Sequence, residues 1–190
     1  DDAFLDAMAA ARIRGALVGV ASVTEAGLKD VYKGFNLHGE ALVARLQAFR
    51  SHGIHVLGSF IFGLPSDRVE TFEATAAFAE RAGVTFAQFV MLTPFPGTID
   101  FAKWEQEVAG HCQEVDGVPV TRHWLIPSAR RPKVYASHPT LSADEIRAHT
   151  QAVWDQFYSV SRVWRRSRVV KSLRARLASL TAQTPSGDSR

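Results

Sequence analysis

Three short runs of almost continuous apolar residues lie along the chain, separated by stretches of mixed apolar and polar residues. The runs are ALVGVA from residue 16 to 21, IHVLGSFIFG from 54 to 63 and TFAQFVML from 85 to 92. Apolar runs of this length that end at glycine, proline or small polar residues are typical of buried strands. We therefore predict three strands within the first 92 residues.

The stretches between these runs have apolar residues at helical spacing. In residues 39–53 the apolar positions Leu42, Val43, Leu46 and Phe49 share one face, and Gly53 ends the predicted helix. Other predicted helices cover residues 5–15, ended by Gly15; residues 25–34, capped by Thr24; residues 67–82, opened by a capping box of Asp67 and Glu70; and residues 99–110.

The order from residue 16 to residue 110 is therefore strand, helices, strand, helix, strand, helix. This is the pattern of a parallel sheet covered by helices, and the predicted fold class is α/β. Because three strands alone leave the sheet edges exposed, the pattern predicts part of a βα barrel or of an open βα sheet.

The C-terminal third has a different character. Residues 118–139 contain four prolines and are expected to be irregular. Ser142 and Glu145 form a capping box that opens a helix to about Tyr158. Residues 161–178 form a predicted basic amphipathic helix, and the polar tail 181–190 is expected to be disordered.

Composition is that of an ordinary globular protein, with 46% hydrophobic and 22% charged residues among 190. No run approaches the roughly 18 apolar residues of a membrane-spanning helix. The acidic start DDAFLDAMAA does not have the pattern of a signal peptide. The single cysteine, Cys112, excludes an internal disulfide framework and fits a cytoplasmic protein.

The formal net charge of +3 is unevenly distributed, because every charged residue between positions 157 and 180 is basic. These residues are Arg162, Arg165, Arg166, Arg168, Lys171, Arg174 and Arg176. Docking of the basic helix on a part of the protein that is absent from this chain, with a solvated basic face, is the favoured interpretation. Peripheral contact with an anionic membrane is the second, and nucleic-acid binding is the least favoured.

The carboxyl ends of the three strands are the expected ligand site, because ligands bind there in parallel βα architectures. The end segments are GVAS at residues 19–22, FGLPSD at 62–67 and MLTPFPGT at 91–98. Gly63 permits close approach of a flat ring, and the prolines stiffen the third loop. The polar side chains that could contact a ligand are Ser22, Ser59, Asp67, Gln88 and Thr93.

Structural interpretations of the same residues remain open. A Gly-Leu-Pro sequence after a strand is often only a turn, Asp67 fits a helix cap, and Gln88 fits a polar core residue. His52 and His55 have HxxH spacing, but Gly53 interrupts the helix and no acidic ligand is near in sequence, so a metal site is not expected. Lys33 and His38 are expected on a loop that could face a substrate, although a solvated surface is the favoured interpretation.

The three strand segments together resemble the radical SAM enzymes, and most closely those with an N-terminal cobalamin-binding domain. The resemblance lies in ALVGVASVTEAGLKDVYKGFN, GIHVLGSFIFGLPSDRVETF and FAQFVMLTPFPGT, and covers about residues 1–176. It implies S-adenosylmethionine (SAM), a 4Fe-4S cluster and a 5′-deoxyadenosyl radical. By this resemblance the cofactor-binding residues are Phe60, Ile61, Gly63 and Leu64 at the adenine, Gly19 and Ser22 near the ribose or methionine, and Met91, Pro94 and Pro96 as a wall.

The chain also departs from that family. Its cluster needs three cysteines spaced CxxxCxxC, and Cys112 alone cannot supply them. Many relatives have glutamate where this chain has Ala21. We therefore expect residues 1–117 to be the C-terminal half of a partial TIM-type (βα)6 barrel, with a helical extension over residues 118–180.

The expected function is that of a cobalamin-dependent radical SAM enzyme that acts by radical transfer or methylation, and its cluster-binding half is absent from this chain. The missing half would be an upstream segment or a separate subunit, and the substrate a small or lipid-like molecule. The alternative is a non-catalytic remnant, or a structural half that binds a partner subunit. Alone, the segment is expected to be inactive.

Overall fold

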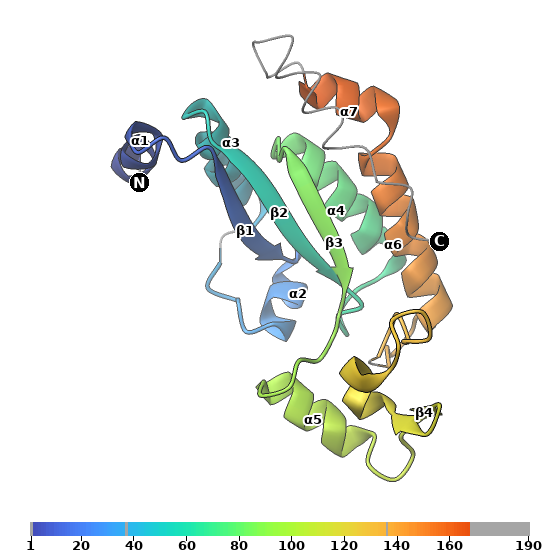
Figure 1. The fold of residues 1–190 in the computed structure, drawn as a ribbon. Helices are drawn as coiled ribbons and strands as arrows, with labels where there is room; N and C mark the ends of the chain where they lie inside the picture. Colours follow the sequence, from blue (N-terminus) through green and yellow to red (C-terminus); the bar gives the residue numbers. More distant parts are fainter. Residues whose placement is uncertain (1, 37, 136, 168–190) are drawn as a thin grey trace.

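A sheet of three parallel strands forms the centre of the structure (Figure 1). The computed structural model describes residues 2–36, 38–135 and 137–167. The strands are β1 (Gly15–Ala21), β2 (His55–Phe62) and β3 (Phe86–Met91), in the order β1-β2-β3. All three lie where the apolar runs predicted them, and the α/β class with a parallel sheet is confirmed.

Helices connect the strands and flank the sheet. They are α1 (Asp2–Ala10), α2 (Glu25–Asp30), α3 (Gly39–Ser51), α4 (Val69–Arg81), α5 (Ile99–Glu107), α6 (Ala143–Phe157) and α7 (Val160–Ser167). Thr24 caps α2 and Ser142 caps α6 as predicted, the latter with Glu145 in a capping box. The prediction for Gly15 was wrong: α1 ends at Ala10, and Gly15 begins β1.

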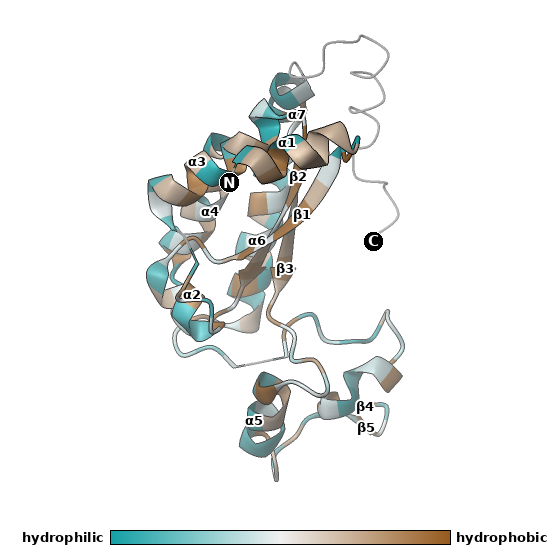
Figure 2. Ribbon diagram, turned by 90° about the vertical axis from the view of Figure 1, so that its left-hand side faces the viewer, coloured by the Kyte–Doolittle hydropathy of each residue, from teal (hydrophilic) through white to brown (hydrophobic). Residues whose placement is uncertain are grey.

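The described helices cover only one face of the sheet. In Figure 2, α3, α4 and α6 lie on one side of the strands. Along β2, Phe60 and Phe62 are fully buried toward these helices, whereas the alternate residues Leu57, Ser59 and Ile61 are half-buried. On the opposite face Leu17 remains 67% exposed. The period of two in a strand separates these two faces.

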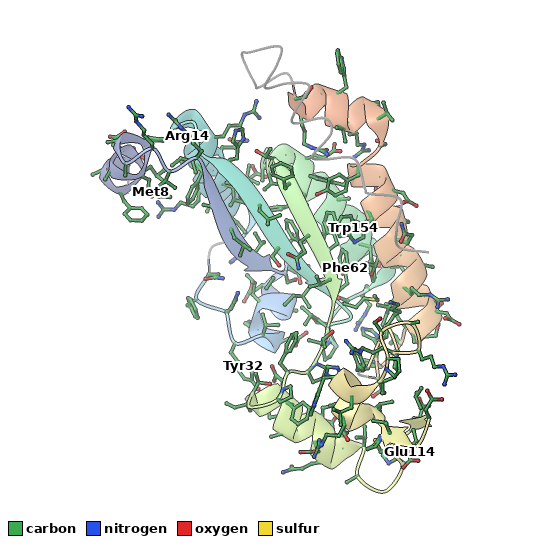
Figure 3. The ribbon with its side chains drawn as sticks, in the orientation of Figure 1. Met8, Arg14, Tyr32, Phe62, Glu114 and Trp154 are labelled. Atoms are coloured by element: carbon green, nitrogen blue, oxygen red, sulfur yellow. The ribbon has the colours of Figure 1, made fainter. Side chains whose placement is uncertain are left out.

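Aromatic rings fill the covered side, around Phe62 and Trp154 in Figure 3. Phe62 stacks on Phe72 of α4 at a centroid distance of 4.4 Å, and Phe60 stacks on Phe89 of β3 at 5.4 Å. Phe89 in turn meets Phe157 of α6 edge to face. These contacts join β2, β3, α4 and α6 into one hydrophobic core.

The outer edge of β3 is closed by side chains of α6. Tyr158, the residue after α6, accepts from the amide of Ala87 (3.0 Å) and donates to its carbonyl (2.8 Å), and the Trp154 indole donates to the Phe89 carbonyl (2.9 Å). These bonds replace the backbone partners that a further strand would provide.

A second, smaller core lies beyond the carboxyl ends of the strands. A short hairpin of β4 (Glu114–Val115) and β5 (Val118–Pro119) leads into the 3-10 helix η1 (Val120–Leu125). The expectation of an irregular segment from residue 118 was wrong for this part. The hairpin spans the expected boundary at residue 117, and the buried residues of this core are Phe101, Trp104, Val120 and Ile126.

Candidate functional site

The loop between β2 and α4 is held together by a buried carboxylate. Asp67 is 1% exposed, and its Oδ2 accepts from the backbone amides of Gly63 (2.9 Å) and Leu64 (3.0 Å). The predicted capping role of Asp67 was wrong. The helix begins at Val69, so Arg68 is the capping residue, and the Asp67 side chain folds back onto its own loop.

Two segments from outside hold the same loop. His138 Nε2 lies 2.9 Å from the Leu64 carbonyl, and the Ser66 amide donates to Asp30 Oδ2 at 3.0 Å. Gly63 has a φ of 86°, which favours glycine. Burial raises the pKa of the Asp67 carboxyl, although the backbone donors of Leu64 and Gly63 act in the lowering direction. The loop is therefore preorganised without a ligand.

The end of β1 is a tight turn in which Ser22 is already engaged. Its Oγ lies 3.2 Å from Thr24 Oγ1 and accepts from the Thr24 amide at 3.3 Å. Ala21 has a φ of 65°, and the pairing with β2 shifts register there. A Cβ on Gly27 would lie 2.2 Å from Ser22 Oγ, so α2 approaches this hydroxyl closely. Ser22 thus contributes to the turn before α2.

The loop after β3 connects the two cores. The Leu92 amide donates to the Phe62 carbonyl at 2.7 Å, which joins the ends of β2 and β3. The Pro94 carbonyl lies 3.3 Å from Nε2 of the buried His123. Pro94 is buried, Met91 is half-buried and Pro96 is exposed.

The expected cofactor residues fall into two groups. All lie at or near the carboxyl edge of the sheet, as the parallel topology requires. Gly19 and Ile61 belong to the uncovered face, whereas the side chains of Phe60 and Leu64 are packed in the interior. Contact of a ligand with Phe60 would therefore have to use its backbone. The cofactor assignment itself stays a prediction.

The uncovered face has a polar row between two apolar rows. The register places Gly19, Ser59 and Gln88 side by side across the three strands. Leu17, Leu57 and Phe86 form the row toward the amino ends, and Ile61 and Val90 form the row toward the carboxyl ends. Gln88 is exposed here, which excludes the interpretation as a core residue.

Lys33, which the sequence placed on a loop that either faces a substrate or is solvated, reaches this same row. Its Nζ donates to the Gly19 carbonyl at 3.1 Å. Sequence reasoning missed this contact because α2 and the following turn separate the two residues. An ammonium group, a hydroxyl and a carboxamide thus gather at one level of an apolar surface, which suits a ligand with both polar and apolar parts.

The described residues do not fit an iron–sulfur cluster. Cys112 belongs to the second core, where its Sγ lies 3.9 Å from Thr121 Oγ1. Within the described ranges no three His, Cys, Asp or Glu side chains gather into a metal site. His52 pairs with Asp6, whereas His55 contacts Thr85, so the HxxH side chains have separate partners.

The described part of the basic segment contacts the body of the protein. Arg162 and Arg165 of α7 both pair with Glu80 of α4, and the Arg166 guanidinium lies 3.8 Å above the ring of Phe157. Residues 168–178 of this segment fall outside the described residues, and membrane contact stays a prediction. No helix in the described ranges is long and apolar enough to cross a membrane.

Comparison with known proteins adds two methyltransferases that match in sequence, while no protein-family model matches. An uncharacterised methyltransferase of Pyrococcus horikoshii is 42% identical over 62 residues, which are 33% of this chain and 13% of that protein. Bacteriochlorophyllide d C-12(1)-methyltransferase of Chlorobaculum tepidum is 37% identical over 93 residues, 48% of this chain and 20% of that one. The chain thus spans a fifth or less of these relatives.

One solved structure is similar over most of the chain. It is the radical S-adenosylmethionine methyltransferase TsrM from Kitasatospora setae, with cobalamin and a 4Fe-4S cluster bound. The TM-score is 0.61 at 22% identity, over 80% of this chain and 34% of that one. The chain therefore shares the fold of about a third of a cobalamin-binding radical SAM methyltransferase, and its sequence relatives are methyltransferases.

Proposed function

We propose that this chain is the cluster-free part of a cobalamin-dependent radical SAM methyltransferase, the C-terminal half of its partial (βα)6 barrel. The observation that supports the proposal most strongly is the uncovered sheet face. An apolar face crossed by Gly19, Ser59 and Gln88 beside the strand ends has the character of a ligand chamber wall. The fold shared with a cobalamin-binding radical SAM methyltransferase supports the same proposal.

The two edges of the sheet indicate where the rest of a barrel would join. Tyr158 and Trp154 close the outer edge of β3. On β1, the Arg14 carbonyl accepts from His55, so alternation turns the backbone groups of Leu17 and Gly19 outward. No described strand pairs with that edge. Further strands would therefore add beside β1.

The proposed chemistry is methyl transfer: a reduced cluster would supply the electron for SAM cleavage, and cobalamin would carry the methyl group. The cluster ligands would come from polypeptide outside this chain, because Cys112 is engaged in the second core. This chain would position the ligand. The Asp67 loop fixes the backbone at the end of β2, Ile61 and Val90 supply apolar contact, and Lys33, Ser59 and Gln88 supply polar contact.

The first test is the DNA sequence that precedes the codon of Asp1. A CxxxCxxC motif in the same reading frame or in a neighbouring gene is the expected result. The complete protein, or the pair of subunits, would then be reconstituted with iron and sulfide without oxygen, and release of 5′-deoxyadenosine from SAM would be measured.

The experiment also separates the alternatives. Cleavage of SAM by the complete protein, but not by the 190-residue chain, would support the proposal. If no cysteine motif exists nearby, or the reconstituted protein does not cleave SAM, the chain is a non-catalytic remnant or a structural half of another assembly.

A further inference from the structure

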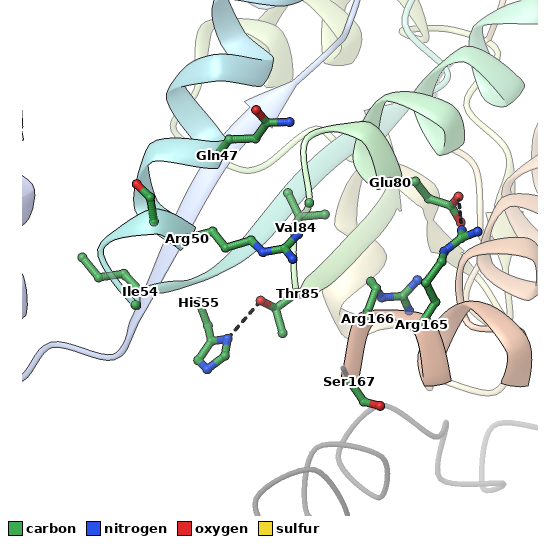
Figure 4. Close-up of a pocket in the computed structure, with 13 residues that line it drawn as sticks. Gln47, Arg50, Ile54, His55, Glu80, Val84, Thr85, Arg165, Arg166 and Ser167 are labelled. Carbon is green, nitrogen blue, oxygen red and sulfur yellow. Dashed lines mark hydrogen bonds and ion pairs between the residues drawn. The ribbon is translucent and has the colours of Figure 1, made fainter. Parts of the chain in front are cut away.

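A cavity lined by described residues lies at the opposite end of the sheet from the proposed cofactor site. Its volume is about 820 Å³. Figure 4 shows residues that line it. The amino ends of β2 and β3 border it with His55 and Thr85, and the ends of α3, α4 and α7 enclose it. A volume in this range suits a small molecule.

Positive charge dominates the lining. Arg50 of α3 and Arg165 and Arg166 of α7 contribute three guanidinium groups, whereas Glu80 is the only carboxylate among the lining residues that the structure describes. Glu80 already accepts from Arg162 and from Arg165, at 2.8 Å from the latter. Little negative charge therefore remains to balance the cavity.

Arg50 and Arg166 occupy different environments. The Arg50 side chain is exposed at the mouth and forms no hydrogen bond or ion pair with any residue in the described ranges. It lies beside Gly83, where an added Cβ would be 3.0 Å from Arg50 Nη1. Arg166 lies deeper, over Phe157, where burial lowers its pKa to about 10 and leaves it charged at neutral pH.

The exposed carbonyl groups at the carboxyl ends of α3 and α4 do not explain why the arginines gather at this cavity. Arginines near helix C-termini offset exposed carbonyl groups. Here the Arg81 carbonyl at the end of α4 accepts from Gln47 Nε2 (2.9 Å), and the Ala48 carbonyl of α3 contacts His52 Nδ1 (2.7 Å). These carbonyls thus have other partners, and the arginines converge from two helices on one cavity.

We propose that this cavity binds a phosphate-bearing small molecule, such as a phosphate monoester or a diphosphate. Guanidinium groups bind phosphate oxygens with paired, charge-assisted hydrogen bonds. The cavity lies at the amino ends of the strands, so this site is separate from the proposed cofactor site and does not depend on it.

Pyrophosphate is the probe for a first test. It would be titrated into the 190-residue chain at constant ionic strength, set with sodium chloride, while the amide resonances of Gly53, Gly83 and Thr85 are followed by NMR. We expect saturable shifts at these amides. No saturable shift, or equal shifts with chloride alone, would overturn the proposal.

Arg50→Gln is the decisive variant, because this side chain has no hydrogen-bond or ion-pair partner to lose among the described residues. It should weaken pyrophosphate binding about tenfold or more, as expected for a lost charge-assisted hydrogen bond. Arg50→Lys should be intermediate. The matched control Arg45→Gln changes an exposed arginine of the same helix outside the cavity and should stay within about twofold of wild type.

Equal affinity of the Arg50→Gln and wild-type chains would contradict the proposal. So would binding of phosphatidylserine vesicles or of a DNA oligonucleotide that pyrophosphate does not displace, because the arginines would then serve a macromolecular surface.

Discussion

Asp67 shows how a single side chain fixes the loop that borders the proposed site. Replacement by alanine leaves the amides of Gly63 and Leu64 without their acceptor in a buried place. We expect Asp67→Ala to lower the free energy of unfolding by about 2–4 kcal/mol, measured by urea denaturation. Asp155→Ala, at an exposed position of α6, should change it by less than about 0.5 kcal/mol. Equal effects of the two variants would contradict this role.

The pKa of Asp67 predicts a specific dependence of stability on pH. Burial raises the native pKa, so the folded state retains this proton at a pH where the unfolded chain has released it. The part of the stability that depends on the proton of Asp67 is therefore full below the unfolded pKa of about 3.9, and it is lost as pH rises through the native pKa. Asp67→Asn should remove this loss from the pH profile of the unfolding free energy, whereas Asp155→Asn should preserve it.

Phe60 and Ile61 are neighbours on opposite faces of β2. Variants at these two positions therefore distinguish a role in core packing from a role in ligand contact. Phe60→Ala removes a fully buried ring and should cost about 3–5 kcal/mol of stability. Ile61→Ala, on the uncovered face, should cost less than about 2 kcal/mol but reduce SAM cleavage by the complete protein at least tenfold. Normal cleavage by a folded Ile61→Ala protein would contradict the assignment of that face.

At the scale of elements, the contacts that cover the outer edge of β3 can be tested by stability and hydrogen-exchange measurements. Tyr158→Phe removes the hydroxyl that bonds both the amide and the carbonyl of Ala87. We expect a loss of about 1–2 kcal/mol and faster hydrogen exchange at the Ala87 amide. Tyr135→Phe is the matched control, because the Tyr135 hydroxyl has no hydrogen bond among the described residues. Unchanged exchange in Tyr158→Phe would show that other contacts close the edge.

The pattern of the sequence predicted the elements well and their ends less well. Apolar runs located all three strands, and local capping spacing located the starts of α2 and α6. Gly15 was misassigned because its pairing with the distant His55 in the sheet competes with a helix end. Asp67 was misassigned because its carboxylate can either cap a helix or, as here, bind the amides of its own loop. The β4–β5 hairpin was missed because each of its strands has only two residues.

At the scale of the whole molecule, the two sheet edges should differ in protection. In the 190-residue chain the outward amides of Leu17 and Gly19 should exchange rapidly and the Ala87 amide slowly. In the complete protein a strand beside β1 should protect Leu17 and Gly19 by at least tenfold. Rapid exchange there in the complete protein would contradict the proposed continuation of the barrel beside β1.

The candidate site was only partly predictable. The strand ends could be predicted, because parallel βα units place them at one edge. The division of Phe60 and Ile61 between faces, the engagement of Ser22 in a turn and the approach of Lys33 to Gly19 depend on how helices pack, which periodicity does not specify. The cationic cavity was missed, because its arginines are more than 100 residues apart and only folding brings them together.

The sequence by itself determined the order and type of the main elements, because hydrophobic period and capping residues act within a few positions. It also determined that Cys112 alone cannot hold a cluster. Only the tertiary structure decided which sheet face is uncovered, which edge α6 closes and which polar groups lie together. Those features follow from contacts between distant residues, such as Tyr158 with Ala87 and Arg165 with Glu80, whose energies depend on three-dimensional packing.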